Sequence, residues 1–560
     1  MVWKAISSPW SCAATVRWTV PALLALLTGL GGAAWGDGNA DISSCSNAVD
    51  RGDDDTAIAL CSRALQSGDL SDESTAIALN DRGNAYADKG QYDRAIQDYD
   101  RAIRLNPNLA EAYNNRGIAY RDKSEYDRAI QDYDRAIRLN PNFAEAYYNR
   151  GNAYIQKGEY DRAIQDYDEA IQLNPNYAHA YRGRGNAYDH VGEYDRAIQD
   201  LDRAIRLNPN DGAAYDGRAN AYADMGEHDR AIKDYDQAIR LRPNDPVLYY
   251  DRGTTHYDTG DYKRAIQDYD QAIQLNPNFA EAYDSRGNAY LHEGEYDRAI
   301  RDYDQAIRLR PDYAIAYNNR GNAYLQNGEY DRAIQDYSQA IRLNSNSAEA
   351  YNNRCAAYYR KGEYDRAIQD CDQAIRLKPD YAEAQRNLGL MYWHGRGVPQ
   401  DYAEAMRRFR NAAEQGDATA QNSLGAMYYT GQGAPQNYPE ALKWFRKAAG
   451  QGNADAQNNL GAMYYQGQGV PLDYAEATKW YRKAAEQGDA GAQSNLGIMY
   501  HNGQGVPQDY VQAYMWFNLA AAQGNEHAAK NRDVVAAKMT SAEVSKAKQL
   551  ARDWLANHQQ

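Results

Sequence analysis

The chain has 560 residues, far more than one ordinary hydrophobic core can organise, so we expect several domains or a repeat array. It carries 62 basic and 77 acidic residues, which gives a formal net charge of −15. This excess of acid argues against a nucleic-acid partner and against docking on anionic lipid, because both favour a basic surface. Tyrosine occurs 50 times and phenylalanine only five times, as expected when one residue type recurs at a fixed position of a repeat.

Residues 1–36 have the pattern of a secretory signal peptide. Lys4 and Arg17 precede an apolar run that ends at Ala34, and cleavage after Gly36 would place small residues at both −3 and −1. The alternative is an uncleaved membrane anchor, but the run is short, contains glycines and lacks a basic flank behind it. We therefore expect a periplasmic or secreted protein with no integral membrane segment after signal cleavage.

From residue 76 to residue 381 the sequence repeats nine times with a period of 34. A typical unit starts at Ala110 and reads AEAYNNRGIAYRDKSEYDRAIQDYDRAIRLNPNF. With Ala110 as position 1, most units have Gly at position 8 and Tyr at position 11, and all nine have Ala at position 20. Each half of a unit has apolar and small residues at helical spacing, and a Gly near position 15 opens a turn between the halves. Asn-Pro-Asn stops the second half, because proline cannot continue a helix.

This pattern resembles the tetratricopeptide repeat (TPR). The resemblance implies an all-α fold, an α-solenoid superhelix of stacked helix-turn-helix repeats, whose concave groove is lined by the first helix of each hairpin. Neither helix can bury its apolar face alone, so each hairpin must stack on its neighbours.

Residues 382–525 continue with four units of a different period, 36 residues, marked by Gly389, Gly425, Gly461 and Gly497. The motif LGAMYYQGQGVPLDY in the third of them resembles the Sel1-like repeat, a close relative of the TPR. Residues 526–560 are expected to form C-terminal capping helices. There, Thr540 and Glu543 have the spacing of a capping box.

Four cysteines remain after signal cleavage, and they form two pairs with a separation of 16: Cys45, Cys61, Cys355 and Cys371. The second pair occupies positions 8 and 24 of the ninth unit. Placing the first pair in the same frame identifies residues 37–75 as a degenerate TPR unit that caps the N-terminus. In an exported chain these pairs favour two structural disulfides. The alternative is that each cysteine merely replaces a small buried residue.

Position 7 is Arg and position 23 is Asp in all nine units, from Arg82 and Asp98 to Arg354 and Asp370. We predict a ladder of Arg–Asp ion pairs along the hairpins. The functional alternative is an array of anion-binding arginines, which the matching acid in every unit makes less favoured.

Asparagines recur at positions 6 and 9 of the first half, where the resemblance implies the groove. An Asn side chain can offer a donor and an acceptor to a peptide backbone, so these residues are candidates for capturing an extended peptide. The alternative is that Asn is simply common at these positions in the family. The candidates are Asn84, Asn115, Asn149, Asn152, Asn186, Asn220, Asn288, Asn319, Asn322 and Asn353.

No catalytic motif and no metal-ligand spacing is found, so no enzyme activity and no cofactor is expected. The function favoured by the sequence is a non-catalytic scaffold of the cell envelope or extracellular space that binds proteins or extended peptides. One alternative is a cell-wall or polysaccharide assembly factor. Another is a Sel1-like protein that binds or hydrolyses β-lactams, although such relatives carry a cysteine pair in each repeat and the Sel1-like units here have none.

Overall fold

The structure, a computed structural model, describes residues 37–558, and every regular element among them is an α-helix. The predicted signal peptide, residues 1–36, lies outside the described residues. The chain divides into two compact units, one that ends at Glu293 and one that begins at Gly294. Between residues 37 and 558 no helix is both long and apolar enough to cross a membrane.

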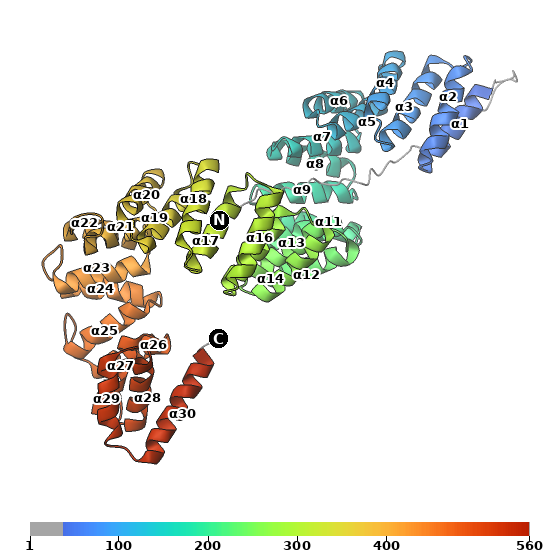
Figure 1. The fold of residues 1–560 in the computed structure, drawn as a ribbon. Coiled ribbons are helices and arrows are strands. Elements are labelled where there is room, and N and C mark those ends of the chain that lie inside the picture. The colour runs from blue at the N-terminus through green and yellow to red at the C-terminus, as the bar shows by residue number, and fades with distance from the viewer. Residues whose placement is uncertain (1–36, 559–560) are drawn as a thin grey trace. The chain divides into compact units, whose positions relative to one another are not determined.

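The first unit consists of helix hairpins that stack in chain order (Figure 1). Its helices are α1 (Asp37–Asp50), α2 (Asp54–Gln66), α3 (Asp72–Asp88), α4 (Tyr92–Leu105), α5 (Ala110–Asp122), α6 (Tyr126–Leu139), α7 (Ala144–Gln156), α8 (Tyr160–Leu173), α9 (Ala178–His190), α10 (Tyr194–Leu207), α11 (Gly212–Asp224), α12 (His228–Leu241), α13 (Pro246–Asp258), α14 (Tyr262–Leu275) and α15 (Ala280–His292).

The second unit continues the same architecture and ends in two helices that follow the last repeat hairpin. Its helices are α16 (Tyr296–Leu309), α17 (Ala314–Gln326), α18 (Tyr330–Leu343), α19 (Ala348–Lys361), α20 (Tyr364–Leu377), α21 (Ala382–His394), α22 (Tyr402–Glu414), α23 (Ala418–Thr430), α24 (Tyr438–Gly450), α25 (Ala454–Gln466), α26 (Tyr474–Glu486), α27 (Ala490–Asn502), α28 (Tyr510–Ala522), α29 (Glu526–Ala536) and α30 (Ser541–His558).

The turn within each TPR hairpin depends on a left-handed residue at position 15. Gly90 and Gly158 have φ of 71° and 73° there, which glycine adopts without steric cost. The second TPR hairpin has Ser124 instead, with φ of 61°, and it is the single non-glycine residue with positive φ among the described residues. The second helix then ends as its sequence predicts: Asn106 leaves the helical conformation and its side chain accepts from the amide of Asn108 at 3.1 Å.

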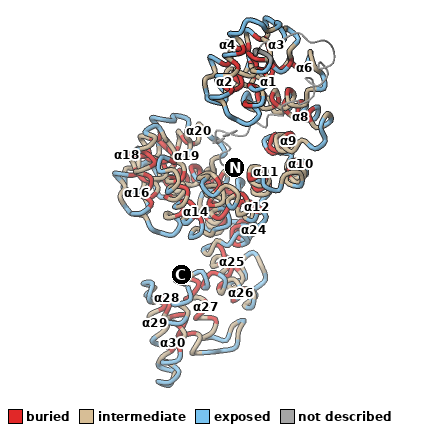
Figure 2. The backbone as a smooth tube through the Cα atoms, turned by 90° about the vertical axis from the view of Figure 1, so that its right-hand side faces the viewer, coloured by how far each residue is buried: buried red, intermediate tan, exposed pale blue. Residues whose placement is uncertain are grey.

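Inside most hairpins, a glycine at position 8 makes room for the aromatic ring at position 24. Tyr99 is fully buried, and a Cβ built on Gly83 would lie 2.6 Å from its ring. The four Sel1-like hairpins repeat the arrangement with another ring, such as Phe445 against Gly425. The two backbones of such a hairpin therefore approach closely around one large side chain. Buried residues occur along the helices, and the turns between helices are largely exposed (Figure 2).

Successive hairpins pack through the second helix of one and the first helix of the next, as α4 packs on α5 and α6 on α7. The first helices also touch one another directly, from α3 through α15 in the first unit and from α17 through α21 in the second. Among the described helices, no comparable packing links the second helices of neighbouring repeat hairpins. The first helices therefore line the inner side of each unit, in agreement with the expectation from the family. We call this surface the inner face.

The C-terminal cap has the local structure that its sequence predicts. The Thr540 amide donates to the Glu543 carboxylate at 2.7 Å, and the Glu543 amide donates back to the Thr540 hydroxyl at 3.3 Å. Helix α30 packs on α28, where Trp554 lies edge-on to Trp516 with ring centres 6.1 Å apart. The capping box is confirmed.

Candidate binding surface

The arginine at position 7 is a structural clamp rather than an exposed anion site. Arg116 donates to both carboxylate oxygens of Asp132 on the same hairpin, at 2.7 and 2.6 Å. Its third nitrogen donates to Asp100 on the preceding hairpin at 2.6 Å. Burial alone would lower the pKa of Arg116, but the two carboxylates raise it, so the guanidinium stays charged. The bidentate pair recurs at Arg82, Arg116, Arg150, Arg184, Arg218, Arg252, Arg320 and Arg354.

The predicted Arg–Asp ladder is therefore confirmed in these eight hairpins, but the prediction missed half of it. The second acid, at position 25, connects each hairpin to the next, as Asp134 does for Arg150 at 2.6 Å. At the two ends of the series a serine accepts instead, Ser62 for the first arginine and Ser338 for the last. Asp recurs at position 25 in the sequence. The sequence alone does not show that this Asp lies beside the position-7 arginine of the next hairpin.

Both cysteine pairs lie where position 8 meets position 24, the place filled by glycine and an aromatic ring in most other hairpins. The structure joins each pair through its sulfur atoms, and all four cysteines are fully buried. The Cα–Cα distances are 5.3 and 5.5 Å, within the usual range for a disulfide. The pairs are Cys45–Cys61 and Cys355–Cys371. Their oxidation in the native protein stays a prediction.

The groove asparagines at position 9 mainly serve the hairpin to which they belong. Four of them accept a hydrogen bond from the tyrosine at position 24: Asn84, Asn152, Asn220 and Asn322, at 2.6–2.8 Å. Asn288 donates to Asp284 of its own helix, at 3.5 Å. Asn186 differs from all of these, because Leu201 stands at position 24 of its hairpin and offers no hydroxyl group.

The groove asparagines at position 6 connect one hairpin to the next. The side-chain amide of Asn115 donates to Asn80 at 3.1 Å, and that of Asn149 donates to Asn114 at 3.0 Å. Asn353 donates in the same way to its neighbour on α17 at 3.1 Å, and Asn319 is half-buried at the equivalent place. Position 6 of one hairpin thus faces position 5 of the preceding one, and we call each such contact a rung. These bonds occupy some of the hydrogen-bonding groups that the asparagine side chains would need to bind a peptide. The peptide-binding role of these residues therefore stays a proposal.

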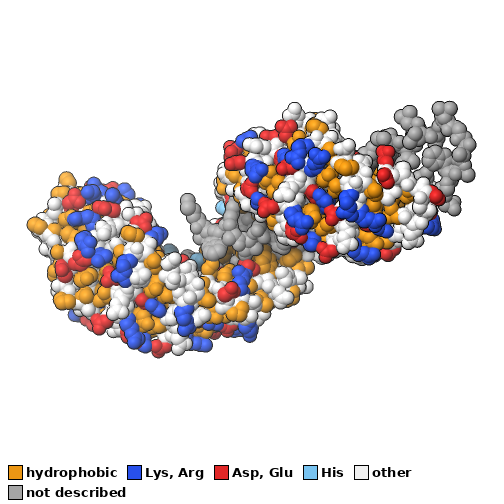
Figure 3. Space-filling model, turned by 90° about the horizontal axis from the view of Figure 1, so that it is seen from above, with side chains coloured by type: hydrophobic (Ala, Val, Ile, Leu, Met, Phe, Trp, Pro, Cys, Tyr) orange, Lys and Arg blue, Asp and Glu red, His pale blue; other side chains and the backbone are white. Residues whose placement is uncertain are grey.

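The inner face of the first unit is strongly acidic. Along α3 to α15, positions 2, 5, 6, 9, 12 and 13 hold twelve acids against two arginines. The same positions of α17, α19 and α21 in the second unit hold two acids and two arginines. On the face of the molecule drawn in Figure 3, basic and acidic side chains are interspersed. The first unit therefore offers a predominantly acidic surface along its first helices.

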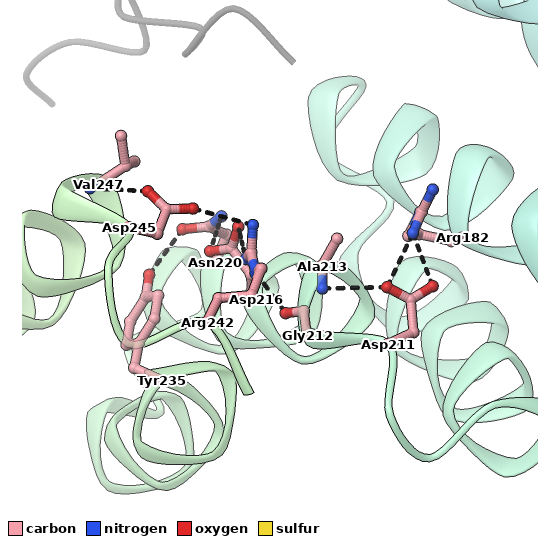
Figure 4. Close-up of polar contacts among 10 residues, drawn as sticks. All are labelled: Arg182, Asp211, Gly212, Ala213, Asp216, Asn220, Tyr235, Arg242, Asp245 and Val247. Atoms are coloured by element: carbon pink, nitrogen blue, oxygen red, sulfur yellow. Dashed lines mark hydrogen bonds and ion pairs between the residues drawn. The ribbon is translucent and has the colours of Figure 1, made fainter. Parts of the chain in front are cut away.

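A charged cluster beside this surface lies around Arg242, which follows α12 where most repeats have the capping asparagine (Figure 4). Its guanidinium donates to Asp245 at 3.0 Å, to Asp216 at 3.2 Å and to the carbonyl oxygen of Gly212 at 3.2 Å. Its Nε is buried without a hydrogen-bond partner. Nearby, Arg182 donates to Asp211 at 2.7 Å. One arginine thus bridges two carboxylates and the backbone on the inner face.

Family comparisons account for almost all of the repeat region. Tetratricopeptide repeat models match residues 83–121, 114–178, 148–212, 219–260, 253–293, 287–328, 321–362 and 348–381. The Sel1 repeat model matches residues 382–417, 418–453, 454–489 and 490–525. The chain is a tetratricopeptide repeat protein with C-terminal Sel1 repeats. Proteins built from TPR and Sel1 repeats are typically non-catalytic scaffolds for interactions between proteins. Among curated protein sequences no match was found.

Solved structures similar to this TPR–Sel1 protein include a protective antigen of uropathogenic Escherichia coli, c5321, with an SLR fold. It shares 23% identity over 77% of this chain and 95% of its own, with a TM-score of 0.43. A Sel1 repeat protein from Oxalobacter formigenes shares 33% identity over 37% of this chain and 87% of its own, with a TM-score of 0.33. YrrB, described as a TPR protein with an unusual peptide-binding site, shares 26% identity over 33% and 96%, with a TM-score of 0.30.

Proposed function

We propose that this protein is a non-catalytic scaffold of the cell envelope or extracellular space that binds polypeptide segments along its inner face. The strongest support is a difference between the two helices of each hairpin in how much their sequences vary from repeat to repeat. The second helices are nearly identical, with YDRAIQDYD in α4, α6 and α8. The first helices change at positions 5 and 6, for example from Asn114 to Tyr148 to Arg182. A surface that varies on an invariant framework suits recognition of a partner.

Two features support the location outside the cytoplasm. Residues 1–36 have the composition of an export signal. Both cysteine pairs are placed for disulfides, which persist in oxidising compartments and are rare in the cytosol. The alternatives of a polysaccharide assembly factor and a β-lactam enzyme have no comparable support, and the absence of nitrocefin hydrolysis by the purified protein would remove the enzyme alternative.

A panning experiment tests the proposed function. Residues 37–560 would be immobilised and challenged with a phage library of random twelve-residue peptides. The blocking variant carries Asp122→Trp and Gln156→Trp, two exposed residues at position 13 of the first helices α5 and α7. The matched control carries Gln131→Trp and Gln165→Trp, two exposed residues on the second helices α6 and α8 of the same hairpins.

The proposal predicts that peptides enriched on the wild type lose their enrichment on the blocking variant and keep it on the control. Equal loss on both variants would place binding away from the inner face. No enrichment over an empty surface would count against polypeptide binding itself.

A further inference from the structure

One rung of the inner face differs from the others in its chemistry. Asn115 on Asn80 and Asn149 on Asn114 show that position 6 of a first helix meets position 5 of the preceding one. In the same register, Asp251 of α13 meets Asp216 of α11. Two carboxylates thus stand where other rungs have an amide–amide hydrogen bond, and neither can donate when both are ionised.

The surroundings of this rung are short of positive charge. Arg242 is the cation that contacts it, and Arg242 already bridges Asp216 and Asp245. With Asp251, three carboxylates share one guanidinium. Burial raises the pKa of Asp251, and the charges of Asp216 and Asp245 raise it further against the opposing effect of Arg242. Burial likewise raises the pKa of Asp216. A further cation would relieve this repulsion.

A second observation next to the rung indicates a ligand. Asn186 is only 8% exposed, and its Nδ2 has no hydrogen-bond partner. In several other hairpins a tyrosine hydroxyl donates to the Oδ1 of the equivalent asparagine, a bond that Leu201 cannot make with Asn186. The Oδ1 of Asn186 lies against Gly217 of α11, the residue that follows Asp216, so this side chain borders the rung. A buried donor without a partner is costly, and a backbone carbonyl of a bound segment would satisfy it.

We propose that a lysine or arginine side chain of an extended basic polypeptide docks between Asp216 and Asp251, while Asn186 donates to a backbone carbonyl of the same segment. The proposal rests on the proposed function and names the class of its ligand. The acidic inner face of the first unit is complementary in charge to such a segment and would raise its rate of association. Within residues 37–558 no group of His, Cys, Asp and Glu is arranged for a metal ion, so a side-chain cation is the better fit.

Fluorescence anisotropy on residues 37–560 tests the proposal. The probe is a labelled ten-residue peptide of alternating lysine and serine, and the comparison peptide has glutamine in place of each lysine. The test variant is D216N/D251N, which keeps the shape of both side chains and removes their charge. The control is D195N/D229N, which removes the same charge from exposed positions on α10 and α12.

The lysine peptide should bind the wild type at least about tenfold more tightly than the glutamine peptide. D216N/D251N should lose at least about tenfold of that affinity, and D195N/D229N should stay within about twofold, as expected for a general field effect. Equal losses in the two variants would show attraction by net charge rather than by the rung, and this would overturn the proposal. So would equal binding of the two peptides.

The single variant Asp251→Asn tests whether a loss of peptide binding is caused by misfolding. The introduced amide can donate to Asp216 as Asn115 donates to Asn80, so the variant should bind the lysine peptide more weakly and yet resist urea at least as well as the wild type. A variant that is both weaker in binding and less stable would assign the two aspartates to the framework and would contradict the proposal. If neither peptide binds and panning also fails, the proposed function itself is lost. If panning succeeds and the lysine preference is missing, only the ligand class is wrong.

Discussion

Removing the Cys355–Cys371 link should loosen one hairpin by a predictable amount. The variant is Cys355→Ala with Cys371→Ala, which replaces two fully buried side chains on α19 and α20. The pair closes a loop with a sequence separation of 16. The chain-entropy relation assigns about 3 kcal/mol to a loop of that length.

That free energy corresponds to a change of about 150-fold in the equilibrium for opening the hairpin. Each hairpin in a solenoid contacts only its neighbours, so we expect the loss to be concentrated in α19, α20 and the helices that pack on them. Hairpin α5–α6 in the other unit serves as the internal reference.

Hydrogen exchange read by mass spectrometry measures this opening one helix at a time. Oxidised wild type, reduced wild type and the alanine variant should be compared. The reduced wild type separates the cross-link from the packing of the two sulfur atoms. We expect amides of α19 and α20 to lose protection in both altered forms and those of α5 and α6 to keep it. Equal protection in all three forms, or four free thiols in protein purified from its native compartment, would refute the reasoning.

Three further predictions concern single residues. Ser124→Gly should stabilise hairpin α5–α6 by about 1 kcal/mol in urea unfolding, because Ser124 holds a positive φ that costs an L-residue about that much; an unchanged midpoint would contradict this. Gly117→Ala should destabilise the same hairpin by about 1–3 kcal/mol in the same assay, since the added Cβ would lie 2.7 Å from the buried ring of Tyr133; full tolerance would show that the ring can shift. The stability that Asp216 and Asp251 contribute should be fully present below their unfolded pKa of about 3.9 and should be lost as the pH rises through their raised folded pKa values. Urea unfolding at acid and neutral pH should show this loss in the wild type and a smaller loss in Asp251→Asn, and the opposite slope would reject the charge assignment.

The period of the sequence was enough to predict the hairpins, because features within one repeat are local. Gly90 at the turn, Asn106 at the end of a helix, and the Thr540–Glu543 capping box all act within a few residues of their position. The Arg–Asp pair could also be predicted, since both members belong to one hairpin and recur together.

Contacts between hairpins could not be predicted in this way, because the sequence does not state the register of stacking. Asp100 could therefore not be predicted as the second partner of Arg116, and neither could the hydrogen bond that the groove asparagine Asn115 donates to the preceding hairpin. Because the TPR units share one period, a single known rung predicts that position 6 faces position 5 of the preceding hairpin in every other TPR unit. That step identifies the meeting of Asp216 and Asp251.

Photo-crosslinking tests the central claim, that the inner face binds polypeptide, most directly. A benzophenone amino acid would replace Gln326, exposed on the first helix α17, or Gln335, exposed on the second helix α18 of the same hairpin. The same pair of positions, Gln156 and Gln131, is available in the first unit. Irradiation in the native compartment should yield protein adducts from Gln326 and Gln156 and few from Gln335 and Gln131. Adducts of equal yield from both helices, or from the second helices alone, would contradict the account.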